Sequence, residues 1–420
     1  MTPPALATSH PRDGLEQNLV LCADGTGNSF DTNKSNVVRL IECLELGREA
    51  EQLVFYDQGV GTSPASAGAA RAFKRASHRP ALTILDEPTV GWWPASTLAR
   101  LAGLGFGFGL KENLRQMYEA LAVAYKSDER TPVFLFGFSR GAFTVRALAA
   151  VIHRCGLLPR DRLGAFRDAY DAFFDERHRE RMAPEARRAF DARLAKFRND
   201  NGARDCRIRF LGIWDTVKSY GFIYPKSLPH LRHNPSVGAV RHAAALGERR
   251  SYYQLTSWGG VDHPVYQDAR PDDSRDVKEV WFAGSHSDVG GGYPPAGNGL
   301  ARAPFEWMVR EAQRFGLQVS DAGLDYVLKE FATDLTMHES LWGPWWIAEL
   351  LPRFELENIP FPGQRMLKWG STGTRDPLTV MRGNRIAVHR TALDWYGEAG
   401  LRFAGEGLIE RVETPPAPLA

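Results

Sequence analysis

The 420-residue sequence has few cysteines and almost no net charge. The four cysteines are far apart and show none of the paired spacings of zinc or redox sites; we expect reduced, mostly buried thiols, as in a protein made in the cytoplasm. They are Cys22, Cys43, Cys155 and Cys206. The formal net charge is only +2, so no basic field favours nucleic acid. The sequence therefore predicts no metal, no cofactor and no nucleic-acid partner.

Long hydrophobic runs are also lacking. The longest apolar stretch, at about residues 98–110, is interrupted by glycines and is too short to span a bilayer. Residues 1–17 are polar and contain proline, without the apolar segment of a signal peptide. These features predict a cytoplasmic protein whose export would need a signal-independent secretion system.

Short apolar segments alternate with longer helical patterns along the chain, which is typical of a parallel sheet flanked by helices. The sequence thus predicts an α/β fold with a mainly parallel sheet. The predicted strands are residues 19–23, 52–56, 133–136, 208–213 and 280–283, and the predicted helices are residues 35–46, 111–125, 141–153 and 236–246.

Composition divides the chain into a main domain, residues 18–320, and flanking parts. A flexible tail (1–17) precedes this domain, and a helical extension packed on the core (321–411) and a proline-rich tail (412–420) follow it. Two segments look inserted, at about 64–110 and 160–200. The second combines many arginines with six aromatic residues. We favour a solvated helical hairpin whose aromatic side chains pack on the core; the alternative is a basic face for anionic lipids or acidic partners.

The most informative segment is the turn Gly137-Phe138-Ser139-Arg140-Gly141. It lies between the predicted strand 133–136 and the predicted helix 141–153, with Ser139 at its apex. Glycine on either side lets strand and helix approach where other side chains would collide. The helix directs the positive end of its dipole at the serine. This arrangement predicts a nucleophilic hydroxyl, although the five-residue pattern alone also occurs by chance.

A nucleophilic serine needs a base and an acid that orients it. Asp215 ends an apolar strand, where a lone carboxylate is costly unless it is paired. His286 heads a glycine-rich loop after another strand. The order Ser139, Asp215, His286 is the one expected for a strand–turn–helix nucleophile. Asp288 is an alternative acid, although it more naturally fixes its own loop, and His389 is an alternative base.

The loop Asp24-Gly25-Thr26-Gly27-Asn28 follows the first predicted strand. Its backbone N–H groups at Gly25 and Thr26, with that of Arg140, could form an oxyanion hole. A tight turn or a phosphate-binding loop is the alternative, but no Lys-Ser/Thr pair follows the glycines. Asp24 is expected to cap a helix N-terminus or to brace the loop rather than to act in catalysis.

Five motifs give the chain a family resemblance: ADGTGN, VGT within YDQGVGT, FGFSRGAFTVRALA, GIWDTV and WFAGSHSDVGGGY. In this order they resemble an α/β-hydrolase family, formerly classed as a domain of unknown function, that includes the catalytic domain of type VI secretion phospholipase effectors. The resemblance covers residues 18–320. It implies an α/β-hydrolase-like sheet and a serine hydrolase that acts on acyl esters, with phospholipid as one substrate. By this resemblance the family's nucleophile corresponds to Ser139, its acid to Asp215 and its base to His286. Cys22-Ala23 departs from the family pattern, which has Phe beside the aspartate.

The combined interpretation is a serine esterase or lipase, phospholipase-like and of bacterial type, that contacts membranes peripherally. The alternatives are a hydrolase of small soluble esters or thioesters, and a catalytically silent binding module. Exposed aromatic residues would favour the lipid substrate by holding an acyl chain, whereas simple packing of the insertions would not. These residues are Trp92, Trp93, Phe106, Phe108, Trp342, Trp345 and Trp346. Oligomeric state has no signal in the sequence.

Overall fold

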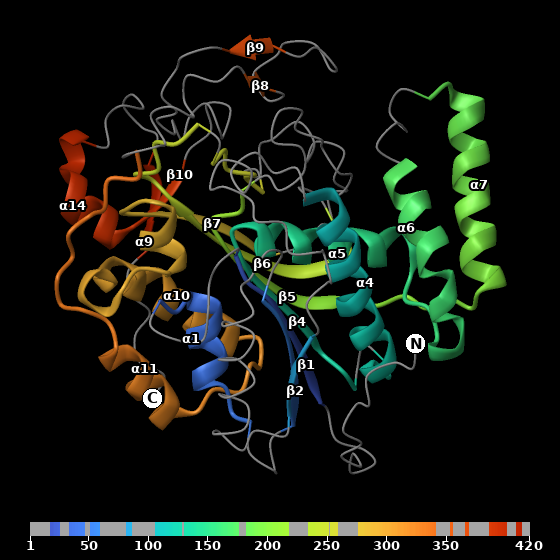
Figure 1. Ribbon diagram of the computed structural model, residues 1–420, viewed down its shortest axis with the longest axis horizontal. Coiled ribbons are helices and arrows are strands. Elements are labelled where there is room, and N and C mark those ends of the chain that lie inside the picture. Colours follow the sequence, from blue (N-terminus) through green and yellow to red (C-terminus); the bar gives the residue numbers. More distant parts are fainter. Residues whose placement is uncertain are drawn as a thin grey trace, which may run out of the picture.

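One parallel sheet organises the fold in the computed structural model (Figure 1). The structure describes residues 17–25, 33–46, 51–58, 81–85, 106–127, 130–175, 182–217, 234–251, 253–258, 276–341, 353–355, 366–368, 386–400 and 409–413. Within these residues nine strands hydrogen-bond in the order β11-β10-β7-β6-β5-β4-β1-β2-β3. Every neighbouring pair in this sheet is parallel. The predicted α/β class is confirmed.

The strands of the sheet are β1 (Asn18–Ala23), β2 (Gln52–Asp57), β3 (Leu82–Ile84), β4 (Val133–Phe138), β5 (Ile208–Trp214), β6 (Val237–Ala245), β7 (Asp276–Phe282), β10 (Ile386–His389) and β11 (Ile409–Glu413). A separate antiparallel pair joins β8 (Arg353–Glu355) to β9 (Met366–Lys368). Each of the five predicted strands matches an observed strand to within a few residues.

Both faces of the sheet are buried, which explains why its strands are apolar without interruption. In β4, Val133 and Leu135 belong to one core, whereas Phe134, Phe136 and Phe138 belong to the other. Successive side chains of a strand point to opposite faces, so one continuous apolar run supplies both cores. Helices α4 (Phe106–Ala124) and α5 (Arg140–Cys155) cover the first face, and α1 (Asn36–Cys43), α10 (Arg302–Gln313) and α11 (Asp321–Lys329) cover the second.

The strand order reverses between β1 and β4. From β1 the chain builds outward to β2 and β3 on one side, and then returns to add β4, β5, β6 and β7 on the other. At such a reversal the loops after two adjacent strands run to opposite faces and leave a crevice at the carboxyl edge. Here Asp24 follows β1 and Ser139 follows β4. The topology alone therefore places the loop that carries Asp24 beside the turn that carries Ser139.

One predicted helix is wrong. Residues 236–246 were expected to be helical because their alanines favour that state, but Val237–Ala245 form strand β6 between β5 and β7. Tertiary context overrides propensity here. Ala239, Ala243 and Ala245 are fully buried in the core shared with α10, so small side chains let that helix pack closely on the strand.

The C-terminal part contributes more than helices. Helix α14 (Arg390–Gly400) follows β10, but β10 and β11 also extend the main sheet beyond β7. These two strands had no clear signal in the sequence pattern. The short helix α9 (His286–Gly290) and three 3-10 helices at Arg160–Ala165, Pro295–Gly297 and Gly299–Ala301 complete the described elements.

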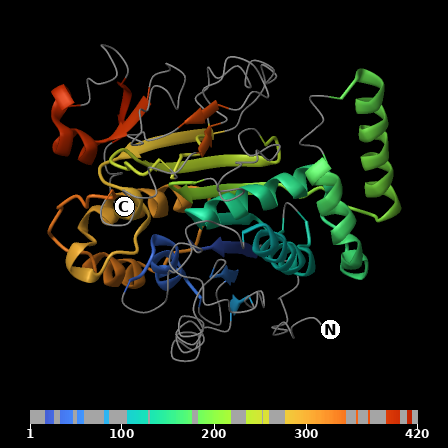
Figure 2. The same ribbon diagram turned by 45° about the horizontal axis from the view of Figure 1, so that its top comes forward.

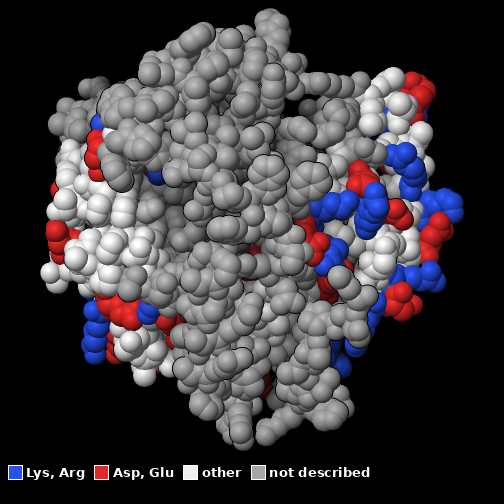
Figure 3. Space-filling view, viewed as in Figure 1, with Lys and Arg blue, Asp and Glu red and all other residues white. Residues whose placement is uncertain are grey.

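The segment 160–200 forms helices α6 (Phe166–Asp175) and α7 (Pro184–Asp200), which project from the edge of the molecule (Figure 2). As predicted, its aromatic residues pack on the core under α5. Charged side chains of both signs are interspersed over these helices (Figure 3). Arg154 pairs with Asp191, and Lys196 pairs with Asp200. The exposed face is therefore mixed in charge, which does not favour the basic-face alternative.

In the part of the chain that the structure describes, no helix is long and apolar enough to cross a membrane. The same residues contain no cluster of three or more histidine, cysteine, aspartate or glutamate side chains that could hold a metal ion. Trp92, Trp93, Trp342, Trp345 and Trp346 lie outside the described residues, and Phe106 and Phe108 fall in the first turn of α4.

Candidate active site

Ser139 occupies a strained turn between β4 and α5. Its backbone has φ 58° and ψ −119°, and its N–H donates to the carbonyl of Trp214 at 3.0 Å. The neighbouring residues Gly137 and Gly141 have no room for a side chain. A Cβ on Gly137 would lie 2.6 Å from the backbone nitrogen of Ala142, and one on Gly141 would lie 2.1 Å from the carbonyl oxygen of Ala23. Real Cβ atoms do not approach so closely, so only glycine permits this turn.

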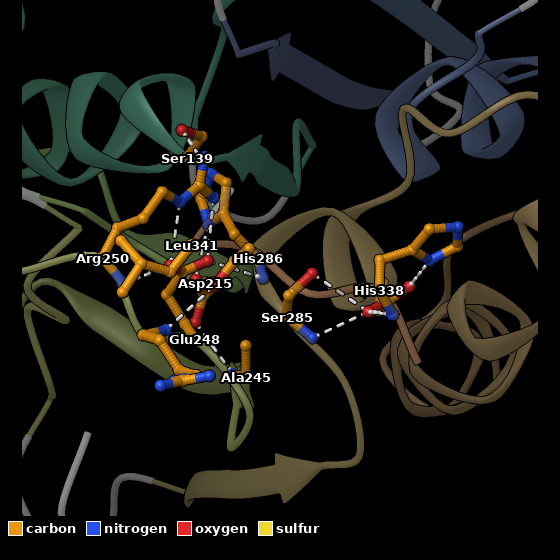
Figure 4. Close-up of polar contacts among 12 residues, drawn as sticks. Ser139, Asp215, Ala245, Glu248, Arg250, Ser285, His286, His338 and Leu341 are labelled. Atoms are coloured by element: carbon orange, nitrogen blue, oxygen red, sulfur yellow. Dashed lines mark hydrogen bonds and ion pairs between the residues drawn. The ribbon is translucent and has the colours of Figure 1, made fainter. Parts of the chain in front are cut away.

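A continuous hydrogen-bond chain begins at the serine (Figure 4). The Oγ of Ser139 lies 2.8 Å from Nε2 of His286, and Nδ1 of the same ring lies 2.5 Å from Oδ2 of Asp215. All three side chains are buried, with Asp215 fully so. The structure thus brings His286 together with Asp215, 71 positions before it in the chain, and with Ser139, 147 positions before it.

Asp215 is held by backbone groups of β6. Its N–H donates to the carbonyl of Ala243 at 2.8 Å, and its Oδ1 accepts from the N–H of Ala245 at 2.8 Å. Its φ is +39°. Within the described residues, Ser139 and Asp215 are the two non-glycine residues with positive φ. Such strain persists only where surrounding contacts enforce it, and it concentrates at functional sites.

The ring of His286 lies between two aromatic rings. Phe138 packs on it at 4.7 Å between centroids, and Tyr253 meets it edge-on at 4.9 Å. Burial lowers the pKa of His286 below its usual 6.5, and the positive charge of Arg250 acts in the same direction. The hydrogen bond and charge of Asp215 oppose these effects without reversing them. The ring is therefore neutral at neutral pH, with Nε2 facing the serine hydroxyl.

Asp288, the alternative acid, has a different set of partners. Its Oδ2 accepts from the N–H of Ser285 at 2.8 Å, which completes a capping box at the start of α9. Its Oδ1 lies 2.7 Å from Nδ1 of His338. Asp288 therefore fixes the turn that carries His286, and in the described chain it is Asp215 that contacts the imidazole ring.

The alternative base His389 lies at the end of β10, where its ring stacks on Phe282 at 4.6 Å and its Nδ1 lies 3.0 Å from the hydroxyl of Thr391. Burial lowers the pKa of His389 to about 4. Of the two candidate histidines, the structure brings His286 to Ser139.

Comparison with known proteins places the chain in a family. The model of the type VI secretion phospholipase effector Tle1-like catalytic domain matches residues 17–311. The chain belongs to this family. Its matched region contains Ser139, Asp215 and His286, together with every strand from β1 to β7.

Individual relatives of this Tle1-like chain are distant. An uncharacterized protein of Saccharomyces cerevisiae is 29% identical over 254 residues, which cover 59% of this chain and 33% of that protein. A crystal structure of an uncharacterized protein from Pseudomonas aeruginosa aligns with TM-score 0.40 and 18% identity, over 76% of this chain and 49% of that one. The Tle1 effector bound to the VgrG spike of the type VI secretion system aligns with TM-score 0.31 and 17% identity, over 69% and 53%. The chain thus spans a third to about half of these relatives.

In this family member the loop after β1 is braced by Asp24, as expected. The buried carboxylate accepts from the hydroxyl of Ser35 at 2.5 Å, from that of Tyr56 at 3.0 Å and from the N–H of Gly25 at 2.7 Å. Burial, together with the negative charge of Asp24, raises the pKa of Tyr56 well above its usual range. Thr26 lies outside the described residues.

Glu248 and Arg250 also lie at the site, although the sequence pattern did not indicate them. Glu248 is fully buried and accepts from the N–H of His286 at 3.2 Å and from the guanidinium of Arg250 at 2.8 Å. That guanidinium lies 3.6 Å above the ring of Tyr253, which itself contacts His286. Both residues follow β6, so the wrong helix over 236–246 hid them: a correctly predicted strand would have placed them in a loop at the carboxyl edge.

Proposed function

We propose that the protein is a serine hydrolase that cleaves carboxylic acyl esters, with lipid or phospholipid esters as its substrates. Ser139 is the nucleophile, His286 the general base and Asp215 the acid that orients the base. The observation that carries this proposal is the unbroken hydrogen-bond chain from Ser139 through His286 to Asp215. Membership of a phospholipase effector family supports the lipid substrate.

In this mechanism Asp215 accepts a hydrogen bond from Nδ1–H of His286, which keeps the proton on Nδ1 and leaves the Nε2 lone pair facing Ser139. As Oγ attacks the ester carbonyl, Nε2 takes its proton and then delivers it to the leaving alcohol, which yields an acyl-enzyme. Water then attacks the acyl carbon while Nε2 takes one of its protons. The bond between that carbon and Oγ breaks, Oγ regains the proton from Nε2, and the carboxylic acid is released. The lowered pKa of His286 keeps the ring able to accept the proton at neutral pH.

The oxyanion would be stabilised at the crevice between β1 and β4. Arg140 begins α5, so its N–H and the helix dipole face the position next to Ser139. We propose Gly25 and Thr26 as the other donors. The Gly25 N–H now bonds to Asp24, so it joins the hole only if the loop turns when substrate binds. No step in this scheme uses a metal or a cofactor.

The first test is covalent labelling. A fluorophosphonate should label the protein in the wild type and leave Ser139→Ala unlabelled, with hydrolysis of a lipid ester reduced by about 10⁶-fold. Ser287→Ala, in the same region but outside the hydrogen-bond chain, is the control and should label normally. Undiminished labelling of Ser139→Ala would reject the assignment of the nucleophile, and an unlabelled wild type would favour a silent binding module.

A further inference from the structure

A second buried histidine–carboxylate pair lies next to the first. Glu279 of β7 is the direct cross-strand partner of His242 of β6. Nδ1 of His242 lies 2.7 Å from Oε2 of Glu279, and the His242 side chain is fully buried. Neither residue belongs to the chain that joins Ser139 to Asp215, and neither carried a signal in the sequence.

Glu279 has its other hydrogen bonds satisfied as well. The hydroxyl of Ser257 donates to Oε1 at 2.6 Å and the N–H of Trp258 donates to Oε2 at 2.7 Å. Burial raises the pKa of the Glu279 carboxyl, but the hydrogen bonds from His242, Ser257 and the Trp258 N–H outweigh this and hold the pKa below its usual value. A charged carboxylate here accepts a hydrogen bond from Nδ1–H, which keeps the proton on Nδ1 and so fixes the tautomer of His242.

The other ring nitrogen of His242 reaches the residue after Asp215. With the proton on Nδ1, the Nε2 lone pair accepts the N–H of Thr216 at 3.2 Å. The carbonyl of Thr216 in turn accepts the N–H of Thr256 at 2.8 Å. Thr216 is therefore held through both its N–H and its carbonyl, directly after Asp215, whose backbone has φ +39°.

We propose that His242, oriented by Glu279, is a positioning residue for Asp215: through the Thr216 N–H it maintains the strained backbone that directs the Asp215 carboxylate at His286. It touches no substrate. An L-residue at positive φ relaxes unless contacts enforce that conformation. A carboxylate displaced by about 1 Å would orient the imidazole poorly and lower turnover without changing substrate binding. This inference depends on the proposed hydrolase function.

The test compares His242→Leu with His242→Gln. Leucine removes the acceptor for Thr216, whereas the glutamine amide provides one oxygen and one N–H in similar positions. We expect His242→Leu to lower kcat by up to about 100-fold with KM unchanged, because a misplacement of about 1 Å can cost that much. His242→Gln should remain close to the wild type. In both, thermal unfolding and circular dichroism measure the folded fraction.

Arg241 offers a matched control. It is the adjacent residue of β6, is equally buried, and bonds to a buried carboxylate, Glu311, from the opposite face of the strand. Arg241→Met should destabilise the protein with kcat preserved. If His242→Leu and Arg241→Met change kcat and Tm in parallel, His242 is merely structural and the proposal is wrong.

A second readout is independent of turnover. The short Asp215–His286 hydrogen bond should give a far-downfield proton resonance in NMR spectra, present in the wild type and His242→Gln and shifted or lost in His242→Leu. If His242→Leu does not fold, His242→Leu combined with Glu279→Gln removes the unpaired buried charge and is used instead. An unchanged resonance in the leucine variant overturns the proposal. Failure of the hydrolase function itself would appear separately, as an unlabelled wild type.

Discussion

At the scale of single residues, strain and hydrogen bonding single out the same positions. Ser139 and Asp215 have positive φ without being glycine, and both contact His286. A structural role alone would not explain why two strained residues converge on one imidazole. The sequence could indicate Ser139 and His286 through strand-end context, but the φ of Asp215 depends on hydrogen bonds from β6 that no local pattern reveals.

The two candidate acids can be separated by the same substitution. Asp215→Asn should lower kcat roughly 10⁴-fold, because asparagine favours the wrong tautomer of the base. Asp288→Asn should largely retain kcat and cost about 1 kcal/mol of stability, because it weakens the capping box of α9. Steady-state kinetics and thermal unfolding of both variants measure the difference. If Asp288→Asn were inactive and Asp215→Asn remained active, Asp288 would be the acid that orients His286 and Asp215 would not.

The pH dependence of kcat/KM should report the ionisation of His286 in the free enzyme. Only the neutral ring accepts the serine proton, and burial lowers its pKa below 6.5. Activity should therefore be lost as pH falls, with a midpoint below 6.5. Arg250→Met removes a positive charge that lowers this pKa, so its midpoint should move upward. A wild-type midpoint above 6.5, or no shift in the variant, would contradict this electrostatic account.

At the scale of elements, the turn that carries Ser139 depends on the close packing of α5 against the end of β1. Gly141→Ala would place a Cβ 2.1 Å from the carbonyl oxygen of Ala23, a backbone atom of a central strand. We expect a loss of about 1–3 kcal/mol in stability and a large loss of labelling at Ser139. Gly164→Ala is the control because nothing lies within 4 Å of its added Cβ. Equal Tm and equal labelling in the two variants would show that α5 packs less closely on β1 than the structure indicates.

The sequence predicted those elements whose local residue pattern favours the same secondary structure as their packing in the fold. Buried strands flanked by polar loops, such as β4 and β5, were recognised because both faces demand apolar residues. Strand β6 was not, since its alanines favour a helix and only the neighbours β5 and β7 make it extended. That one error also concealed His242, Glu248 and Arg250, which lie on β6 or directly after it.

At the scale of the whole molecule, the sheet explains why the site lies where it does. The strand order reverses between β1 and β4, and in open α/β sheets ligands bind at the carboxyl edge beside such a reversal. Strands β5, β6 and β7 then deliver Asp215, the backbone that holds it and His286 to the same edge. The described surface of α6 and α7 is mixed in charge, so substrate selection should depend on apolar contact at the crevice rather than on a long-range field.

The acyl chain provides the final prediction. If lipid esters are the substrates, kcat/KM should rise with chain length, because each buried methylene contributes about 0.8 kcal/mol, or roughly fourfold. A series of p-nitrophenyl esters from acetyl upward, followed by phospholipid vesicles, measures this dependence. Ser139→Ala serves as the blank for each substrate, so that uncatalysed hydrolysis is subtracted. A flat series, or a preference for acetyl esters and thioesters, would replace the lipid substrate with small soluble esters while leaving the roles of Ser139, His286 and Asp215 intact.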